Sequence, residues 1–221
     1  MSEQFAELKP VPYHVISGGG VATALKSSTR PKAVEVLAPN ILRTPRLVLR
    51  PLRANDREQF LHMIDVSRVQ LERWVRPHRE GESDLALFER QLMMCEEGDR
   101  RGLAFRRVAM LDDGRLAGCF NLNSISRGII CEADFTWWMS SELTGAGLAT
   151  EAAEAMMEFA LLAHPSGLGL HRVQAAIHPS NARSVKMASK LGLKKQEGAT
   201  VSILMGEQWE AHDLYSRTVT G

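Results

Sequence analysis

The sequence predicts a mixed α/β domain of the α+β kind, with a central twisted mixed sheet of about seven strands flanked by helices and an N-terminal extension. Two observations support this fold class. Segments with the two-residue alternation of strands recur along the chain, and segments with helical spacing of apolar residues interrupt them. Helices that interrupt a mostly antiparallel series of strands are typical of α+β and mixed α/β folds.

The chain divides into an expected N-terminal extension, residues 1–40, and an expected domain, residues 41–221. The extension contains Gly18-Gly19-Gly20 and four prolines, and it shows little periodicity. It lacks a basic start followed by a long apolar run, which argues against a signal peptide. We expect a surface extension rather than a functional lid.

Strand signals begin at Leu42. Leu47 and Leu49 alternate with arginine and valine residues, as in a half-buried strand that extends to Pro51. Asp112-Asp113-Gly114 is the expected hairpin turn between the next two strands. The later expected strands cover residues 104–111, 115–123, 129–139 and 171–178, followed by two strand-like stretches, the last at about 209–219.

Helical spacing of apolar residues predicts the elements between these strands. Asn55 or Asp56 can cap the first helix, which continues to about Val66. The helix that begins near Gly147 carries a single apolar stripe. Asn181 and Gly192 bound the last helix as its cap and its terminator. The expected helices after the first cover residues 69–74, 84–97, 147–163 and 181–191.

Composition favours a soluble globular protein and excludes several functions. Hydrophobic residues make up 44% of the 221 residues and charged residues 24%. The formal net charge of +1 gives no field that would gather nucleic acid or an acidic membrane. No apolar run approaches the ~18 residues of a membrane span. We therefore expect neither a nucleic-acid nor a membrane partner.

Cysteine and histidine usage indicates neither a disulfide framework nor a metal centre. The three cysteines, Cys95, Cys119 and Cys131, are odd in number and widely spaced. The seven histidines are scattered, without ligand spacing beside a carboxylate or thiol. We expect a reduced, cytoplasmic protein without a metal ion.

The most informative junction joins the strand 129–139 to the helix 147–163. A glycine-rich turn that enters a helix is suited to bind an anion, because the first amides of the helix have no internal partners and the helix dipole adds positive charge. Gly145 and Gly147 can adopt positive φ and let a phosphate approach the backbone. No lysine follows, and the spacing is not Gly-x-Gly-x-x-Gly, which disfavours nucleotide loops of those kinds. An ordinary tight turn is the alternative.

Several blocks, in the correct order, make residues 42–219 resemble the GNAT superfamily of acetyltransferases. Residues 137–152 resemble its pyrophosphate motif, (Arg/Gln)-x-x-Gly-x-(Gly/Ala), although Thr144 stands where Arg or Gln is usual. Residues 178–193 are similar to its Asn-x-x-Ser…Lys-Leu-Gly helix. The stretches 43–52, 67–74 and 212–216 resemble the branch that contains the ribosomal-protein alanine N-acetyltransferases.

This resemblance implies a single GNAT-like domain that uses acetyl-CoA as its acyl donor. The backbone of the turn and helix start would hold the pyrophosphate. The strand backbone at Trp137 and Met139 would bind the pantetheine arm and the developing oxyanion, and Asn181 would also bond the arm. The implied turn residues are Thr144, Gly145, Ala146, Gly147, Leu148, Ala149 and Thr150.

The resemblance further implies direct attack of a neutral amine on the thioester. Ser184 matches the family serine that protonates the leaving thiolate. Asp134 and Glu132 share a strand face with Trp138, so either acid is a candidate base for the amine. The alternative is that these acids pair with a nearby arginine such as Arg127.

The expected acceptor is the N-terminal α-amine of a protein or peptide. The branch resemblance supports it, and so does chemistry, because an α-amine has a pKa of about 7.7–8.0 against about 10.4 for lysine. A small-molecule amine is the main alternative acceptor. A non-catalytic acyl-CoA-binding module and a generic phosphate-binding domain are the alternative functions.

Overall fold

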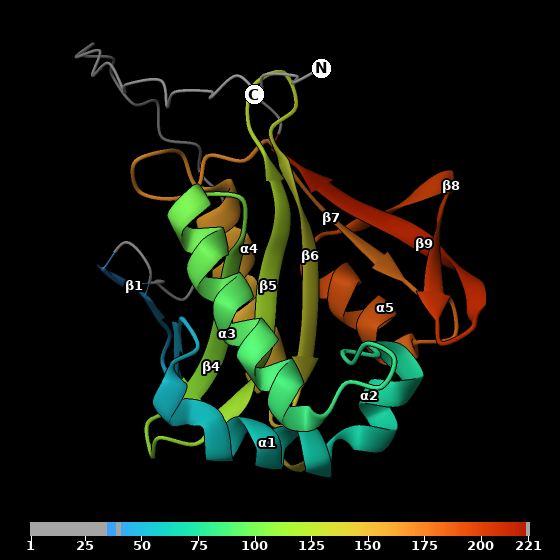
Figure 1. The fold of residues 1–221 in the computed structure, drawn as a ribbon. Coiled ribbons are helices and arrows are strands. Elements are labelled where there is room, and N and C mark those ends of the chain that lie inside the picture. The colour runs from blue at the N-terminus through green and yellow to red at the C-terminus, as the bar shows by residue number, and fades with distance from the viewer. Residues whose placement is uncertain (1–34, 39–40, 220–221) are drawn as a thin grey trace, which may run out of the picture. The chain divides into compact units, whose positions relative to one another are not determined.

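Alternating apolar side chains build a nine-stranded sheet in the computed structural model, which describes residues 35–38 and 41–219 (Figure 1). The strand order is β1-β2-β3-β4-β5-β6-β7-β9-β8. Within the described sheet, β6 and β7 pair in parallel and the other neighbours pair antiparallel. The strands are β1 Glu35–Ala38, β2 Ile41–Arg43, β3 Leu47–Arg50, β4 Phe105–Leu111, β5 Leu116–Ser126, β6 Glu132–Met139, β7 Arg172–Ile177, β8 Lys194–Met205 and β9 Gln208–Thr218.

In the described ranges five α-helices flank this sheet, and the predicted fold class is confirmed. In Figure 1, α1 and α3 lie on one face of β4–β6 and α4 on the other. Two short 3-10 helices, Ala54–Asp56 and Ser141–Leu143, precede α1 and the loop before α4. The α-helices are α1 Arg57–Val66, α2 Arg68–Trp74, α3 Asp84–Arg101, α4 Leu148–Leu161 and α5 Ala182–Lys190.

The sheet has more strands than expected at its N-terminal edge. The predicted strand 42–51 is divided into β2 and β3 by a tight turn, in which the Thr44 N–H donates to the Leu47 carbonyl over 2.9 Å. Pro45 has no N–H to give to a ladder, which explains the interruption. Residues 35–38 add β1 to the sheet, whereas residues 1–34 and 39–40 of the predicted extension lie outside the described residues.

Other elements differ from expectation at their ends. β6 begins at Glu132 rather than residue 129, because Ile129 and Ile130 are exposed in the turn that precedes it. α3 continues to Arg101, where Gly102 takes a positive φ of 67° and ends the helix. Asp56 precedes α1 but makes no side-chain cap, since its carboxylate accepts from the Arg50 guanidinium.

Two hydrophobic cores hold the helices against the sheet. One joins α4 and α5 to the sheet, and the other lies under α1 and α3 and includes Trp138. The buried face of α4 is rich in small residues, including Ala152, Ala153 and Ala160, which let the helix lie close to the strands. This packing fixes the start of α4 beside the end of β6. No helix in the described ranges is long and apolar enough to cross a membrane.

Candidate active site

The loop between β6 and α4 presents a row of free backbone donors. Gly145 and Gly147 have positive φ values of 89° and 77°, and Gly147 is the residue before the first turn of α4. The first amide of this region that donates within the helix is that of Glu151, which bonds the Gly147 carbonyl over 3.1 Å. Within the described residues, no N–H of residues 145–150 donates to a protein acceptor.

These free donors form a concave turn that suits a phosphate group. Unpaired amides at a helix start combine hydrogen bonding with the positive end of the helix dipole. Nothing lies within 4 Å of the position that a Cβ would take at Gly145, so space beside the backbone is open. The Thr144 side chain adds no free donor to this row, because its hydroxyl donates to the Ser141 carbonyl over 3.0 Å.

A second feature is the separation of β6 from β7 beyond a short parallel ladder. The two strands pair only from Glu132 to Asp134 and from Arg172 to Gln174 in the described sheet, and then diverge, as Figure 1 shows. The Ser140 N–H donates to Ala117 of β5 over 2.8 Å, and a Cβ at Gly118 would collide with the Trp138 carbonyl. Residues 138 and 140 therefore direct their backbone groups to β5.

By strand alternation, Trp137 and Met139 direct their N–H and C=O groups into the gap between β6 and β7. The Gln70 side chain of α2 reaches the Met139 carbonyl there at 3.5 Å. The strand backbone that the sequence assigned to the pantetheine arm thus has no partner strand on the side away from β5. Gln70 is not among the site residues predicted from the sequence.

The helix α5 brings the other two predicted residues to the same side of the sheet as α4. Asn181 precedes α5, and its side-chain oxygen accepts from the Ser184 N–H over 3.1 Å. In the described part of the chain, the Ser184 hydroxyl makes no hydrogen bond and is partly exposed. Both residues come shortly after the end of β7 in the sequence, where β7 is no longer paired with β6.

The two predicted acids lie at the paired end of β6 and β7. Glu132 forms an ion pair with Arg172, which donates from Nε over 2.7 Å and from Nη2. Asp134 accepts from the neutral amide of Gln174 over 2.9 Å. Arg127, the partner considered from the sequence, instead donates to the Gly102 carbonyl. Asp134 is therefore the acid without a cationic partner.

Helix α2 contacts the chain at the ends of both β6 and β7. Gln70 contacts the end of β6, and one turn later the Trp74 ring lies 5.8 Å from the ring of His178, just beyond β7. His178 Nε2 also lies 3.4 Å from a carboxylate oxygen of Glu210 on β9. Trp74 could be singled out as an aromatic residue at a helix end, but its partner His178 could not.

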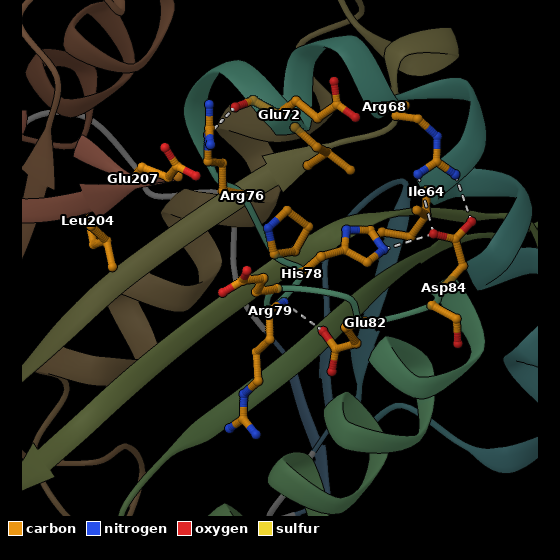
Figure 2. Close-up of a pocket in the computed structure, with 15 residues that line it drawn as sticks. Ile64, Arg68, Glu72, Arg76, His78, Arg79, Glu82, Asp84, Leu204 and Glu207 are labelled. Atoms are coloured by element: carbon orange, nitrogen blue, oxygen red, sulfur yellow. Dashed lines mark hydrogen bonds and ion pairs between the residues drawn. The ribbon is translucent and has the colours of Figure 1, made fainter. Parts of the chain in front are cut away.

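A cavity of about 840 Å³ is lined by residues of α2, of the loop between α2 and α3, and of the turn between β8 and β9 (Figure 2). None of the predicted catalytic or cofactor residues lines it. Figure 2 shows Arg68, His78 and Asp84 at one end, and Arg76 and Glu207 at the other. The lining residues are Ile64, Arg68, Leu71, Glu72, Arg76, Pro77, His78, Arg79, Glu80, Glu82, Ser83, Asp84, Leu204, Gly206 and Glu207.

The cavity carries a mixture of neutralised and free charges. Asp84 accepts from Arg68 at 2.6 Å and lies 2.8 Å from His78, and the hydrogen bond from Arg68 is the main reason that its pKa is lowered. In the same described region, Glu72, Glu80 and Glu207 form no ion pair. Arg76 and Arg79 also line the cavity and form no ion pair in that described region, so free charges of both signs face it. No group of three or more His, Cys, Asp or Glu side chains that could hold a metal ion occurs among the described residues.

Comparison with known proteins agrees with this geometry. Residues 46–194 match the family model of the acetyltransferase (GNAT) domain. The match covers more than half of the chain, so the chain belongs to the GNAT family of acetyltransferases. This assignment confirms the family and the enzyme class that the sequence predicted.

Individual relatives are more distant. The chain is 25% identical over 178 residues to the ribosomal protein uS5-alanine N-acetyltransferase of Escherichia coli (strain K12), covering 80% of this chain and 90% of that protein. It is 29% identical over 102 residues to the probable N-acetyltransferase YjcK of Bacillus subtilis (strain 168), and this match spans 46% of the chain and only 54% of that relative.

A solved structure shares the fold. Mycobacterium smegmatis RimJ in complex with CoA-disulfide superposes with a TM-score of 0.69 at 22% identity, covering 81% of this chain and 83% of that one.

Proposed function

We propose that this protein transfers an acetyl group from acetyl-CoA to a primary amine, and that the amine is the N-terminal α-amine of a protein or peptide. The proposal rests on the row of backbone N–H groups at residues 145–150, which donate to no acceptor within the described residues. Residues 145–147 are exposed and residues 148–150 are buried or half-buried, and unpaired amides at a helix start suit an anionic ligand. Beyond residue 134, β6 has no partner strand on its β7 side, so its backbone groups there are available to an extended arm.

Three parts of the chain would hold the donor. The loop amides would bind the pyrophosphate, the backbone of Trp137 and Met139 would bond the pantetheine arm, and the Asn181 amide would contact it from α5. The bound donor supplies an activated thioester. Residues 145–150 are held by the helix start and β6, so their donors need no rearrangement to receive phosphate.

Two side chains are suited to move protons. The Ser184 hydroxyl, on α5, would give a proton to the leaving sulfur. Asp134 would accept a proton from the amine, directly or through water, because it is held by a neutral amide rather than by a cation. Glu132 would act in the same way only after leaving Arg172, so its smaller role is to secure the paired end of the two strands.

The acceptor assignment rests on chemistry and on one relative. An α-amine has a pKa near 7.7–8.0, so much more of it is neutral at pH 7 than of a lysine side chain, which suits a site with a modest base. The cavity beside α2, of about 840 Å³, would take the acceptor, and its lining has five acidic residues against three arginines, which favours a cationic terminus. A relative that covers 80% of the chain acts, by its name, on a ribosomal-protein alanine.

The donor half of the proposal is tested with Gly147→Val. A β-branched residue is strained at φ 77°, by roughly 1–3 kcal/mol, so CoA affinity measured by calorimetry should fall about 10- to 100-fold. Gly114→Val is the matched control, because Gly114 has a φ of 87° in the turn between β4 and β5. Equal CoA affinity in folded Gly147→Val and wild-type protein would refute the loop assignment.

The acceptor half is tested in the same protein by competition. Acetyl transfer is measured with peptides that have free N-termini, the same peptides with blocked α-amines and an internal lysine, and small polyamines and aminosugars. We expect the free N-termini to be acetylated. If only small amines are acetylated, the acceptor is a small-molecule amine and not a peptide N-terminus. CoA binding without transfer to any amine would favour a non-catalytic acyl-CoA-binding module.

A further inference from the structure

The arginine that precedes β3 is connected to the phosphate loop, although 100 residues separate them in sequence. Arg46 Nη1 donates to the Ala146 carbonyl over 2.9 Å, while Nε and Nη2 each lie 2.6 Å from Oε2 of Glu151. The guanidinium therefore joins the loop to the first turn of α4. It also flanks Gly147, whose Cβ position would lie 3.6 Å from Nη2.

Glu151 is a fixed anchor for this guanidinium. Its other oxygen, Oε1, accepts from the Thr44 hydroxyl over 2.7 Å and from the Arg46 backbone N–H over 2.9 Å. The residue is only 6% exposed. Burial works to raise the pKa of Glu151, but the hydrogen bonds from Thr44 and Arg46 outweigh it and leave that pKa below its ordinary value. The carboxylate is thus charged and held from both sides.

The contact with Ala146 decides which way one peptide group of the loop faces. In a planar trans peptide the C=O and N–H groups point in opposite directions. When Arg46 holds the Ala146 carbonyl, the Gly147 N–H must point away from Arg46. Glycines at positions 145 and 147 leave this peptide with many accessible orientations. A reversed peptide would present a carbonyl oxygen where a phosphate needs a donor.

The same contact has an electrostatic consequence. Glu151 places a buried negative charge in the first turn of α4, next to amides that would receive a pyrophosphate. Without a partner this charge would repel the ligand and offset the positive potential of the helix N-terminus. Arg46 neutralises it, and the fork of the guanidinium reaches the carboxylate and the loop carbonyl together, which a lysine cannot do.

We propose that Arg46, anchored by Glu151 and Thr44, is a positioning residue that orients the Ala146–Gly147 peptide and so prepares the loop for the pyrophosphate of CoA. This inference rests on the proposed function, since it concerns the same donor site. It predicts that Arg46 matters for the part of the ligand that contains phosphate and does not matter for the pantetheine arm.

The test compares two ligands across matched variants. Arg46→Gln and the milder Arg46→Lys are titrated with CoA by calorimetry and with pantetheine, which has no pyrophosphate, by NMR. We expect CoA affinity to fall roughly 10- to 100-fold in Arg46→Gln, as for the loss of a charge-assisted hydrogen bond, and less in Arg46→Lys. Pantetheine affinity should stay unchanged in both. Adding Glu151→Gln to Arg46→Gln should restore part of the CoA affinity, because it removes the uncompensated charge.

Arg50→Gln is the structural control. Arg50 lies four residues further on and forms a buried ion pair with Asp56 at 2.7 Å, away from the loop. Its loss should lower the melting temperature without changing the ratio of CoA to pantetheine affinity. Equal losses for both ligands in the Arg46 variants, or no loss for CoA, would overturn the inference. Wild-type protein that binds pantetheine but gains nothing from the pyrophosphate of CoA would instead overturn the proposed function.

Discussion

Asp134 and Glu132 sit two residues apart on one strand, yet their surroundings differ. Glu132 is held by the Arg172 guanidinium, and Asp134 by the amide of Gln174. An acid that is already paired with a cation is a poor proton acceptor, because protonation would cost it that partner. The two carboxylates therefore differ in their partners, one cationic and one neutral, and mutation can distinguish the roles proposed for them.

Removing the two proposed proton-transfer groups should lower turnover while donor binding is kept. Asp134→Asn and Ser184→Ala should each reduce kcat by about 10²- to 10⁴-fold, the range of a general acid or base, with unchanged affinity for CoA. Steady-state kinetics with the best acceptor peptide and calorimetry with CoA supply the two measurements. Glu132→Gln is the comparison, with a smaller expected loss. If Asp134→Asn and Ser184→Ala both turn over like wild type, water carries the protons.

At the scale of elements, the loop between α2 and α3 forms one wall of the cavity and is held by α3. Arg90 of α3 donates to the Glu82 carboxylate at 2.7 Å and to the Pro77 carbonyl at 2.7 Å. The side chains of Arg90 and Glu82 are only 14% and 9% exposed. This pair therefore fixes the path of residues 75–83, and with it the shape of the cavity in Figure 2.

The stability that this pair supplies should depend on pH. The hydrogen bond from Arg90 lowers the pKa of Glu82 to about 2, from an ordinary value of 4.5. Because the folded pKa is the lower one, the stabilisation is complete above pH 4.5 and is lost as the pH falls towards 2. Glu82→Gln should lower the free energy of unfolding at pH 7 by roughly 1–3 kcal/mol.

Denaturant unfolding of wild type and Glu82→Gln between pH 2 and 7 checks this. The difference between them should shrink as the pH approaches 2. Glu97→Gln is the control, since the Glu97 side chain is 45% exposed and its pair with Arg101 contributes little. A wild-type advantage that stayed constant down to pH 2 would contradict the assignment of the low pKa to this pair.

The sequence was sufficient for the features that are local. Helical spacing and the glycines at 145 and 147 predicted the loop and α4, because capping and positive φ depend on a few neighbouring residues. Contacts such as Arg46 to Glu151 join residues that lie 105 positions apart. Such contacts leave no periodic signal, since they arise only when β3 and α4 meet in the folded sheet. Gln70 and His178 escaped prediction for the same reason.

At the scale of the whole molecule, the two hydrophobic cores support different functional parts of the protein. The core under α1 and α3 supports the loop and α2, which shape the cavity, whereas the core under α4 and α5 supports the loop amides, Asn181 and Ser184. Trp138 and Trp137 point to opposite cores from adjacent positions of β6. One strand therefore connects the side of the loop amides to the side of the cavity, and its backbone lies between them.

The short ladder between β6 and β7 also determines how the molecule should open. β7, β8 and β9 form a ribbon that meets the rest of the sheet at three residue pairs. Local opening should therefore begin along this seam, and amides at the β6–β7 ladder should exchange hydrogen faster than those of the long β4–β5 ladder. A donor that binds to both β6 and the ribbon would stabilise their association and slow exchange along the seam. Mass-spectrometric hydrogen exchange with and without CoA measures this, and uniform protection of the whole sheet would contradict it. Exchange would then report donor binding from amides that the donor itself never touches.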